Sequence, residues 1–123
     1  MKVELRKSFR FEAAHRLPFA PEGHRCRQIH GHSYAVEVCV EGAVDPARQW
    51  LVDYGDILAA CMPVKERLDH HLLNDVPGLE AGTAEALSVF IWNAIRDRLP
   101  GLKEVTVRET ETSSCTYRGE SAA

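Results

Sequence analysis

The sequence contains no hydrophobic stretch long enough to cross a membrane. No run of about 18 apolar residues occurs among its 123 positions. The first residues, MKVELR, do not form the apolar core of a secretion signal. We therefore expect a soluble protein of the cytoplasm with no membrane partner.

Charge of one sign is not in excess either. The chain has 15 lysine and arginine residues against 18 aspartate and glutamate residues, which gives a formal net charge of −3 at pH 7. So small an imbalance does not favour a nucleic acid as a partner. Any binding of phosphate groups must therefore be local, and Arg25 and Arg27 are candidates for such a contact.

Two further absences narrow the class of protein. The four cysteines form no Cys-x-x-Cys pair, which argues against a zinc site made of cysteines alone, and we expect them to be reduced thiols. No Gly-x-Gly-x-x-Gly run is present, so nothing indicates a nicotinamide cofactor. The chain has a mass of 13.8 kDa, with 45% hydrophobic and 27% charged residues, as in one globular domain. We expect that domain to cover residues 1–120, with a short tail at residues 121–123.

Alternating apolar and polar residues predict four strands. Residues 3–15 and 30–41 alternate with a period of two, and a segment containing proline and glycine between them indicates a loop. Residues 103–111 and the shorter segment 115–118 alternate in the same way.

Two helices are predicted between the second and third strands. Asp53 and Thr83 are suited to cap their first turns. Pro63 is expected to kink or shorten the first helix, and the dipeptide Pro100-Gly101 to end the second. The apolar stripes expected to face the core are Tyr54, Ile57, Leu58, Cys61 and Leu68 in the first helix, and Leu87, Phe90, Ile91, Ala94, Ile95 and Leu99 in the second. The order strand, strand, helix, helix, strand, strand indicates an α+β protein.

Histidines are concentrated in the first part of the chain, and none follows residue 71. His30 and His32 lie on one face of the second predicted strand, with Cα atoms about 6.6 Å apart. If the first two strands pair as an antiparallel hairpin, His15 at the end of the first lies beside them. Three imidazoles without a fourth protein ligand are typical of a catalytic zinc site, which keeps one position open.

Cys26 lies four residues before His30, in the loop. Its neighbours Arg25 and Arg27 favour the thiolate form electrostatically. A thiolate near a metal-bound substrate can act as a base, whereas a thiolate that is the fourth zinc ligand would make the site structural and closed. The spacing does not separate these two interpretations.

Asp69 and His70 form a second candidate unit, because an aspartate beside a histidine can orient the ring for proton transfer. Adjacent residues do not necessarily bond to each other, and an Asp-His dipeptide in a loop is more often exposed to solvent. His71 is less suited to this role, and His24 is assigned to the loop, either as a structural residue or as a substrate contact.

Glu109 shares its strand face with the apolar residues Val105 and Val107. A carboxylate on the core side of a strand is costly unless a partner satisfies it. It can accept two parallel N–H bonds from an arginine side chain or from a guanidine-bearing ligand. The residues alone leave both partners open.

Together, these motifs resemble the 6-pyruvoyltetrahydropterin synthase superfamily. The segments are FEAAH ending at His15, CRQIHGH starting at Cys26, LDHH at residues 68–71 and RET around Glu109, and the resemblance extends over residues 3–120. Three residues separate Cys26 from His30, which resembles the bacterial 6-carboxy-5,6,7,8-tetrahydropterin synthase branch of queuosine and 7-deazapurine synthesis. The pyruvoyl branch usually has a longer gap, and another branch carries glutamate in place of the cysteine.

The resemblance implies a fold and an assembly. The fold is the tunnelling fold (T-fold), a ββααββ arrangement of an antiparallel sheet with two helices on one face. The implied assembly is a homohexamer of two trimers, with active sites at the subunit interfaces. The resemblance also implies roles: Zn²⁺ binding by His15, His30 and His32, a general acid/base thiol at Cys26, a second proton-transfer unit at Asp69 and His70, and contact with the guanidine-like edge of a pterin at Glu109.

The implied activity is that of a carbon–carbon lyase acting on 7,8-dihydroneopterin triphosphate. The products would be 6-carboxytetrahydropterin, acetaldehyde and triphosphate. Two related activities remain open: a 6-pyruvoyltetrahydropterin synthase, which keeps the three-carbon side chain, and a dihydroneopterin-processing enzyme, which only cleaves it. A non-catalytic zinc-binding domain with Cys26 as fourth ligand is the alternative from another class. A cysteine hydrolase using Cys26 and His70 is disfavoured, because it leaves His15, His30 and His32 without a role and the sequence shows no oxyanion motif.

Overall fold

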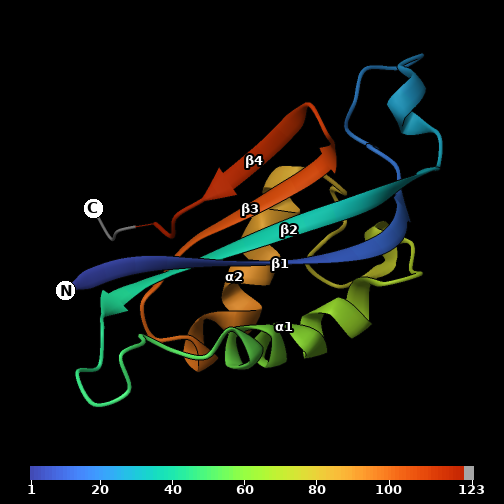
Figure 1. Ribbon diagram of the computed structural model, residues 1–123. Helices are drawn as coiled ribbons and strands as arrows, with labels where there is room; N and C mark the ends of the chain where they lie inside the picture. Colours follow the sequence, from blue (N-terminus) through green and yellow to red (C-terminus); the bar gives the residue numbers. More distant parts are fainter. Residues whose placement is uncertain (121–123) are drawn as a thin grey trace.

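The computed structural model describes residues 1–120, and within them four antiparallel strands form one sheet with two helices on one of its faces (Figure 1). The sheet has the strand order β1-β2-β3-β4. The elements in chain order are β1 (Lys2–His15), η1 (Arg25–Arg27), β2 (His30–Ala43), α1 (Tyr54–Leu68), η2 (Leu73–Asp75), α2 (Ala84–Ile95), η3 (Arg96–Arg98), β3 (Leu102–Thr110) and β4 (Ser113–Tyr117). This order confirms the predicted α+β class. The tail expected at residues 121–123 lies outside the described residues.

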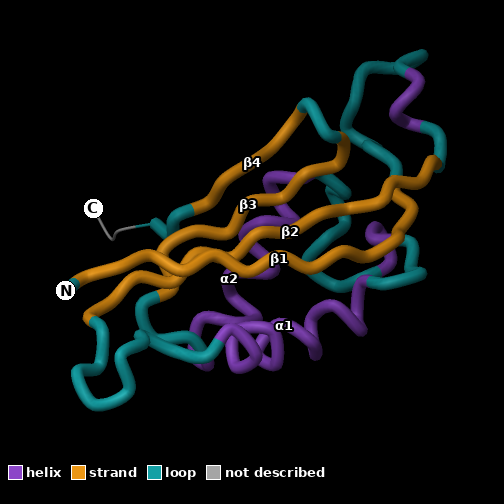
Figure 2. Tube along the Cα trace, in the orientation of Figure 1, coloured by secondary structure: helices purple, strands orange, loops and turns teal. Residues whose placement is uncertain are grey.

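β1 and β2 pair in antiparallel fashion along their whole length. Their traces lie side by side in Figure 2. The register runs from Lys2 opposite Ala43 to His15 opposite His30. Since side chains alternate between the two faces of a strand, this register puts the apolar residues of both strands on the face toward the helices. The predicted hairpin is confirmed, and His15 is next to His30 because the pairing continues to the ends of both strands.

The core lies between the sheet and the two helices. The rings of Phe11 and Tyr34 stack with centroids 4.9 Å apart in its centre. The other buried apolar side chains include Phe9, Ala13, Val36, Val38, Val40, Ile57, Ala60, Cys61, Val64, Leu68, Leu73, Leu79, Leu87, Ile91, Ile95, Leu99, Val105 and Val107. All four cysteines are free, and none of the helices described is long and apolar enough to cross a membrane.

Helix α1 differs from its prediction in two respects. It continues through Pro63 to Leu68, so the expected shortening is wrong. Proline removes one helical hydrogen bond, the one to the carbonyl of Ala59, but both residues are exposed and water can satisfy that carbonyl. The buried stripe contains Ala60 and Val64, whereas Tyr54 is 51% exposed at the start of the helix.

Helix α2 follows its prediction more closely. The Thr83 side chain accepts a hydrogen bond from the N–H of Ala86, and Asp53 caps α1 in the same way through the N–H of Gly55. Four residues of the expected stripe are buried: Leu87, Ile91, Ile95 and Leu99. Phe90 is only half-buried and Ala94 is exposed, because a stripe this wide extends beyond the surface that the sheet can cover.

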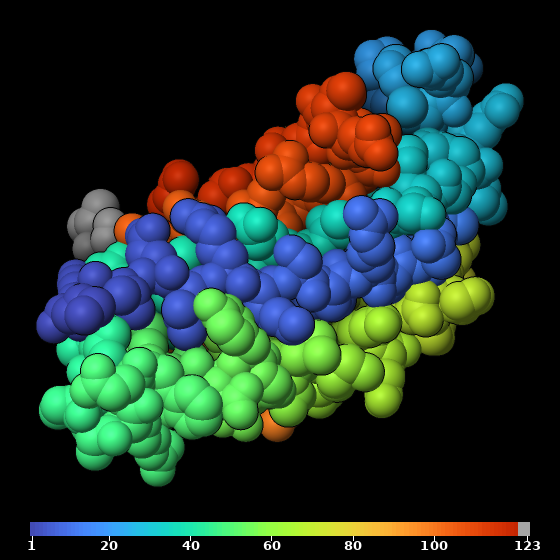
Figure 3. Space-filling view, in the orientation of Figure 1, coloured from blue at the N-terminus to red at the C-terminus, as the bar shows by residue number. Residues whose placement is uncertain are grey.

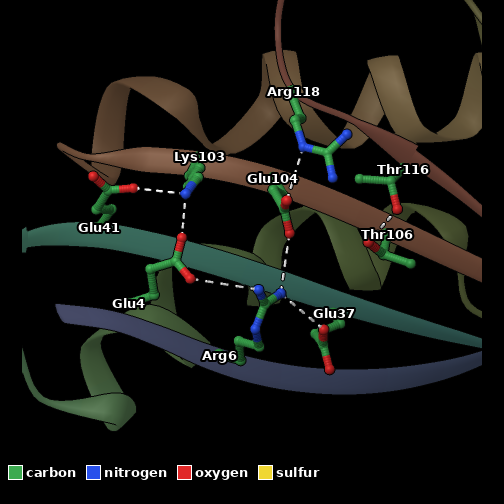
Figure 4. A network of polar contacts seen from close by, with 9 residues as sticks. All are labelled: Glu4, Arg6, Glu37, Glu41, Lys103, Glu104, Thr106, Thr116 and Arg118. Carbon is green, nitrogen blue, oxygen red and sulfur yellow. Dashed lines mark hydrogen bonds and ion pairs between the residues drawn. The ribbon is translucent and has the colours of Figure 1, made fainter.

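The opposite face of the sheet carries a network of ion pairs (Figure 4). Glu104 on β3 is 8% exposed and accepts hydrogen bonds from Arg6 at 3.0 Å and from Arg118 at 2.8 Å. Lys103 bonds to Glu4 and to Glu41. No helix among residues 1–120 covers this face, and its charged side chains other than Glu104 are at least partly exposed to solvent in a single chain.

The network predicts acid-sensitive stability. Lys103 and Lys2 hold the pKa of Glu41 at about 2, below its usual 4.5. A carboxylate with a lowered folded-state pKa stabilises the protein above the unfolded pKa, and this contribution is lost as the pH falls from about 4.5 to about 2. We expect Glu41→Gln to reduce the loss of thermal stability in this pH range, as measured by circular dichroism melting curves. The control is Glu66→Gln. Glu66 is exposed on α1 and forms no ion pair with any of residues 1–120. Equal acid dependence in both variants and the native protein would contradict the prediction.

Candidate active site

The three predicted metal ligands meet at the end of the β1–β2 hairpin. His15 is the last residue of β1, and His30 and His32 begin β2. The Nε2 atom of His15 lies 2.9 Å from that of His30 and 3.1 Å from that of His32. One ligand atom from each ring lies within 4.8 Å of the others. His15 is buried and the other two rings are half-buried, so the cluster is open on one side.

Hydrogen bonds on the far side of two rings set their tautomers. The Nδ1 of His15 lies 2.6 Å from the carbonyl of Gly82, and the Nδ1 of His30 lies 2.9 Å from the carbonyl of Gln28. A carbonyl only accepts, so both Nδ1 atoms carry the hydrogen and both Nε2 atoms are lone-pair donors toward a metal.

This arrangement fits a metal ion. The Nε2 atoms of His15 and His30 are 2.9 Å apart, and neither carries a hydrogen. Their lone pairs repel each other unless a cation lies near both. Tetrahedral zinc with bonds of about 2.0–2.1 Å separates its nitrogen ligands by roughly 3.3 Å, which is close to the observed spacing. Burial lowers the pKa of His32, against an opposing effect of Glu109, and thereby favours the neutral ring that metal binding requires.

Cys26 and Glu109 border the same cavity as the three histidines. The cavity has a volume of about 450 Å³. Cys26 lies in η1 and is half-buried. Its carbonyl accepts a hydrogen bond of 2.7 Å from the N–H of Leu17, which ties the loop to the chain just beyond His15. The structure therefore brings five of the predicted site residues together.

The Glu109 carboxylate has no hydrogen bond or ion pair with any of residues 1–120, so the arginine partner considered from the sequence is not found there. The Glu109 residue is half-buried and also borders a second cavity of about 450 Å³, next to Thr83 at the start of α2 and Cys115 on β4. Burial and the charge of Glu109 both raise the pKa of Tyr34, whose buried hydroxyl likewise has no partner in the described chain. Glu109 is therefore available to a ligand.

Asp69 and His70 form the predicted pair. Asp69 Oδ1 accepts the N–H of Glu12 at 2.9 Å and lies 3.1 Å from His70 Nδ1. The bond from Glu12, followed by the contact with His70, lowers the pKa of the Asp69 carboxyl, so the residue is ionised. An ionised aspartate beside Nδ1 orients the imidazole.

His70 does not face the cavity of Cys26 and Glu109 in the same chain. Its side chain is 78% exposed and borders a separate hollow of about 530 Å³. Only His32 lines both spaces among the predicted residues. The His70 backbone has a φ of 60°, in the left-handed region, where a non-glycine residue is disfavoured by roughly 1–2 kcal/mol. An exposed histidine in a strained backbone is a typical sign of a functional constraint.

Some supporting groups could not be found from the sequence. Gly82, whose carbonyl orients His15, is 67 residues away from it along the chain. The Asn74 side chain holds the same region by bonding to both backbone groups of Arg16 and to the carbonyl of Glu80. The composition of residues 74–82, typical of a turn, was the local signal there, and it does not indicate which groups these residues bond to. His71 bonds through its ring to the carbonyl of Asp69 and has no contact with the three-histidine cluster among the hydrogen bonds described.

The 6-pyruvoyl tetrahydropterin synthase family model matches residues 4–120. The chain belongs to this family. A 6-carboxy-5,6,7,8-tetrahydropterin synthase of Synechocystis sp. is 40% identical over 90% of this chain and 89% of its own length. A 6-pyruvoyl tetrahydrobiopterin synthase of Dictyostelium discoideum is 38% identical over 78% of this chain and 75% of its own length. The predicted resemblance is thus confirmed, and with it the prediction of an enzyme.

The fold of the family is also found. The solved 6-pyruvoyl tetrahydropterin synthase of Caenorhabditis elegans superposes with a TM-score of 0.89 at 25% sequence identity, and the match covers 98% of this chain and 97% of that one. This likeness confirms the predicted T-fold with its ββααββ order.

The orientation of His15 by Gly82 leads to a prediction about metal binding. Gly82 has a φ of 71°, and a Cβ there would lie 2.4 Å from the carbonyl oxygen of Arg16. Gly82→Ala must therefore move the carbonyl that orients His15, and we expect zinc affinity to fall by about 10–100-fold. Competition with a chromogenic chelator measures this change.

Gly78→Ala is the matched control for backbone strain. Gly78 also has a positive φ, of 96°, but the nearest atom to an added Cβ is 3.5 Å away in the ring of Phe90. We expect its zinc affinity to be that of the native protein. Native affinity in the Gly82 variant would show that the carbonyl is not needed to orient the ligand.

Proposed function

We propose that the chain is a zinc-dependent 6-carboxy-5,6,7,8-tetrahydropterin synthase of the queuosine and 7-deazapurine pathway. It would convert 7,8-dihydroneopterin triphosphate to 6-carboxytetrahydropterin, acetaldehyde and triphosphate. The observation that carries this proposal is the single cavity that joins three metal-binding imidazoles, a thiol and an unpaired carboxylate. The Synechocystis relative that bears this name is similar over 90% of the chain.

Each side chain has a distinct task in this reaction. Zinc, when bound by His15, His30 and His32, supplies Lewis-acid polarisation of the substrate's side-chain oxygens. Glu109 accepts two N–H bonds from the amidine-like edge of the pterin ring and orients it in the cavity. Cys26 takes up and returns protons on one side of the substrate chain.

The reaction balances without an external oxidant or reductant. Triphosphate leaves from the end of the side chain, and the dihydropterin ring is reduced while the side-chain carbons are oxidised. One water molecule then completes the carbon–carbon cleavage: the carbon attached to the ring keeps its own oxygen and takes the second carboxylate oxygen from water, and the remaining two carbons leave as acetaldehyde. Proton transfer at both faces of the chain calls for a second acid–base group besides Cys26.

We assign that second group to His70, oriented by Asp69, and we propose that a neighbouring subunit supplies it. His70 borders a different hollow from Cys26 within one chain, which supports a site completed by another copy. Both β1 and β4 are edge strands among the described residues, so the sheet has two edges available for pairing. A homohexamer of two trimers is the proposed assembly, and the cytoplasmic location stays a prediction.

Two alternative functions remain distinguishable. A 6-pyruvoyltetrahydropterin synthase would use the same groups, and the Dictyostelium relative at 38% identity carries a name of that kind. A non-catalytic zinc domain would need Cys26 as the fourth ligand. The group of close ligand atoms within residues 1–120 contains the three histidines and does not include Cys26, which favours an open metal site.

The deciding experiment is product identification with metal analysis of the purified protein. With 7,8-dihydroneopterin triphosphate as substrate, we expect one zinc per chain and release of acetaldehyde together with 6-carboxytetrahydropterin, detected by mass spectrometry. An intact pyruvoyl side chain would assign the protein to the other branch. Cys26→Ala is the control for the structural alternative: retained zinc with lost turnover supports the open site, and lost zinc with lost folding contradicts it.

The left-handed backbone of His70 allows its chemistry to be tested separately from its structural effect. Asparagine tolerates this conformation, so His70→Asn should leave the free energy of unfolding in urea within about 0.5 kcal/mol of the native value. Because the imidazole is lost, turnover should fall by about 10²–10⁴-fold. His71→Asn, at the adjacent exposed position, should keep native turnover. An equal loss in both variants would contradict the assignment to His70.

A further inference from the structure

The loop between β1 and β2 contains a histidine that the roles above leave unused. His24 directly precedes η1, whose second residue is Cys26. Its Nδ1 accepts a hydrogen bond of 3.1 Å from the backbone N–H of Cys26. The loop lies at one end of the molecule, and its atoms protrude there in the space-filling view (Figure 3). An exposed side chain thus holds the backbone of the residue proposed as the acid–base thiol.

Both backbone groups of Cys26 are held by other residues. Its N–H bonds to the ring of His24, and its carbonyl accepts the N–H of Leu17 at 2.7 Å. Because the two anchors lie on opposite sides of the Cys26 Cα atom, rotating either peptide plane breaks one of these bonds. The direction of the Cα–Cβ bond, and hence the position of the thiol, depends on both planes.

His24 is itself fixed by the loop. Its N–H donates to the carbonyl of Pro21 at 2.9 Å, and its carbonyl accepts the N–H of Arg27 at 3.1 Å. The guanidinium of Arg27 donates to the carbonyl of Ala20 at 3.0 Å. These bonds close the loop on itself, so the imidazole meets Cys26 from a defined backbone position.

We infer that His24 is a positioning residue for Cys26: its imidazole accepts the amide hydrogen of Cys26 and thereby holds the thiol in the cavity of the three histidines. The inference rests on the proposed function, in which Cys26 transfers protons. Since Nδ1 is the acceptor, the ring hydrogen lies on Nε2. The role needs an acceptor at this position and no proton transfer by His24.

Asparagine can replace such an acceptor, whereas alanine cannot. Asparagine is among the best residues at the position before a helical turn, because its side-chain oxygen accepts the N–H two residues further on. A positioning role therefore predicts that asparagine restores what alanine loses. A catalytic imidazole at His24 predicts that both variants fail equally.

The test compares His24→Ala with His24→Asn in the zinc-loaded protein. Alkylation of Cys26 by iodoacetamide, followed by mass spectrometry, reports on the thiol without any turnover. We expect the alanine variant to raise the alkylation rate about fivefold, the shift that follows from losing one capping hydrogen bond, and the asparagine variant to restore the native rate. Cys115, which is also half-buried, is the internal reference and should not change.

Turnover is the second measurement. In the alanine variant we expect kcat to fall about tenfold or more, with KM changed by less than about twofold. The asparagine variant should have near-native kcat, and the shape of the pH–rate profile should be the same in both. A native alkylation rate in the alanine variant, or equal impairment of the two variants, would overturn the inference. If alkylation responds as expected while Cys26→Ala keeps full turnover, the proposed role of Cys26 fails and the positioning contact stands.

Discussion

The pairing of β1 with β2 is the constraint on which both the core and the candidate site depend. The two strands, each of 14 residues, pair from end to end. A slip of one residue would turn every side chain of one strand to the other face. It would expose Phe9 and Phe11, bury Arg10 between them, and move His15 away from His30. The hydrophobic burial that sets the register therefore also sets the geometry of the three-histidine cluster.

The remaining groups of the site come from segments that are far apart along the chain and that pack onto the end of this hairpin. The connection before α2 supplies the Gly82 carbonyl, which sets the tautomer of His15. The end of α1 supplies Asp69, which bonds to the backbone of Glu12 on β1. The loop of Cys26 is tied back to Leu17. Packing around the hairpin thus orients the candidate site residues, although the segments that carry them are short and exposed.

The two faces of the sheet differ in what covers them. One face is covered by α1 and α2 and contains the apolar core. The other carries charged residues, and Glu104 is nearly buried there between Arg6 and Arg118 without any helix over it. His70, which contacts Asp69, borders a hollow separate from that of Cys26. The side chains proposed to transfer protons are thus divided between two hollows of one chain, which is the physical reason for proposing a site shared between copies.

Periodicity alone predicted the four strands, the two helices with caps at Asp53 and Thr83, and the meeting of His15 with His30 and His32, because these depend on local alternation and on one hairpin. It was wrong where a local rule met a compensating environment: α1 continues through Pro63 because that face is solvated, and Tyr54 lies outside the stripe. Motif resemblance identified the family, since the motifs are spread over nearly the whole chain. Only the tertiary structure decided that Gly82 orients His15, that Glu109 has no arginine partner among residues 1–120, that His70 borders a different hollow from Cys26, and that His24 holds the Cys26 amide. The first of these relations joins segments 67 residues apart. The relations of Glu109 and His70 depend on which distant segments pack around them, and the contact of His24 depends on how a short loop closes, so no pattern of residue types along the chain determines them.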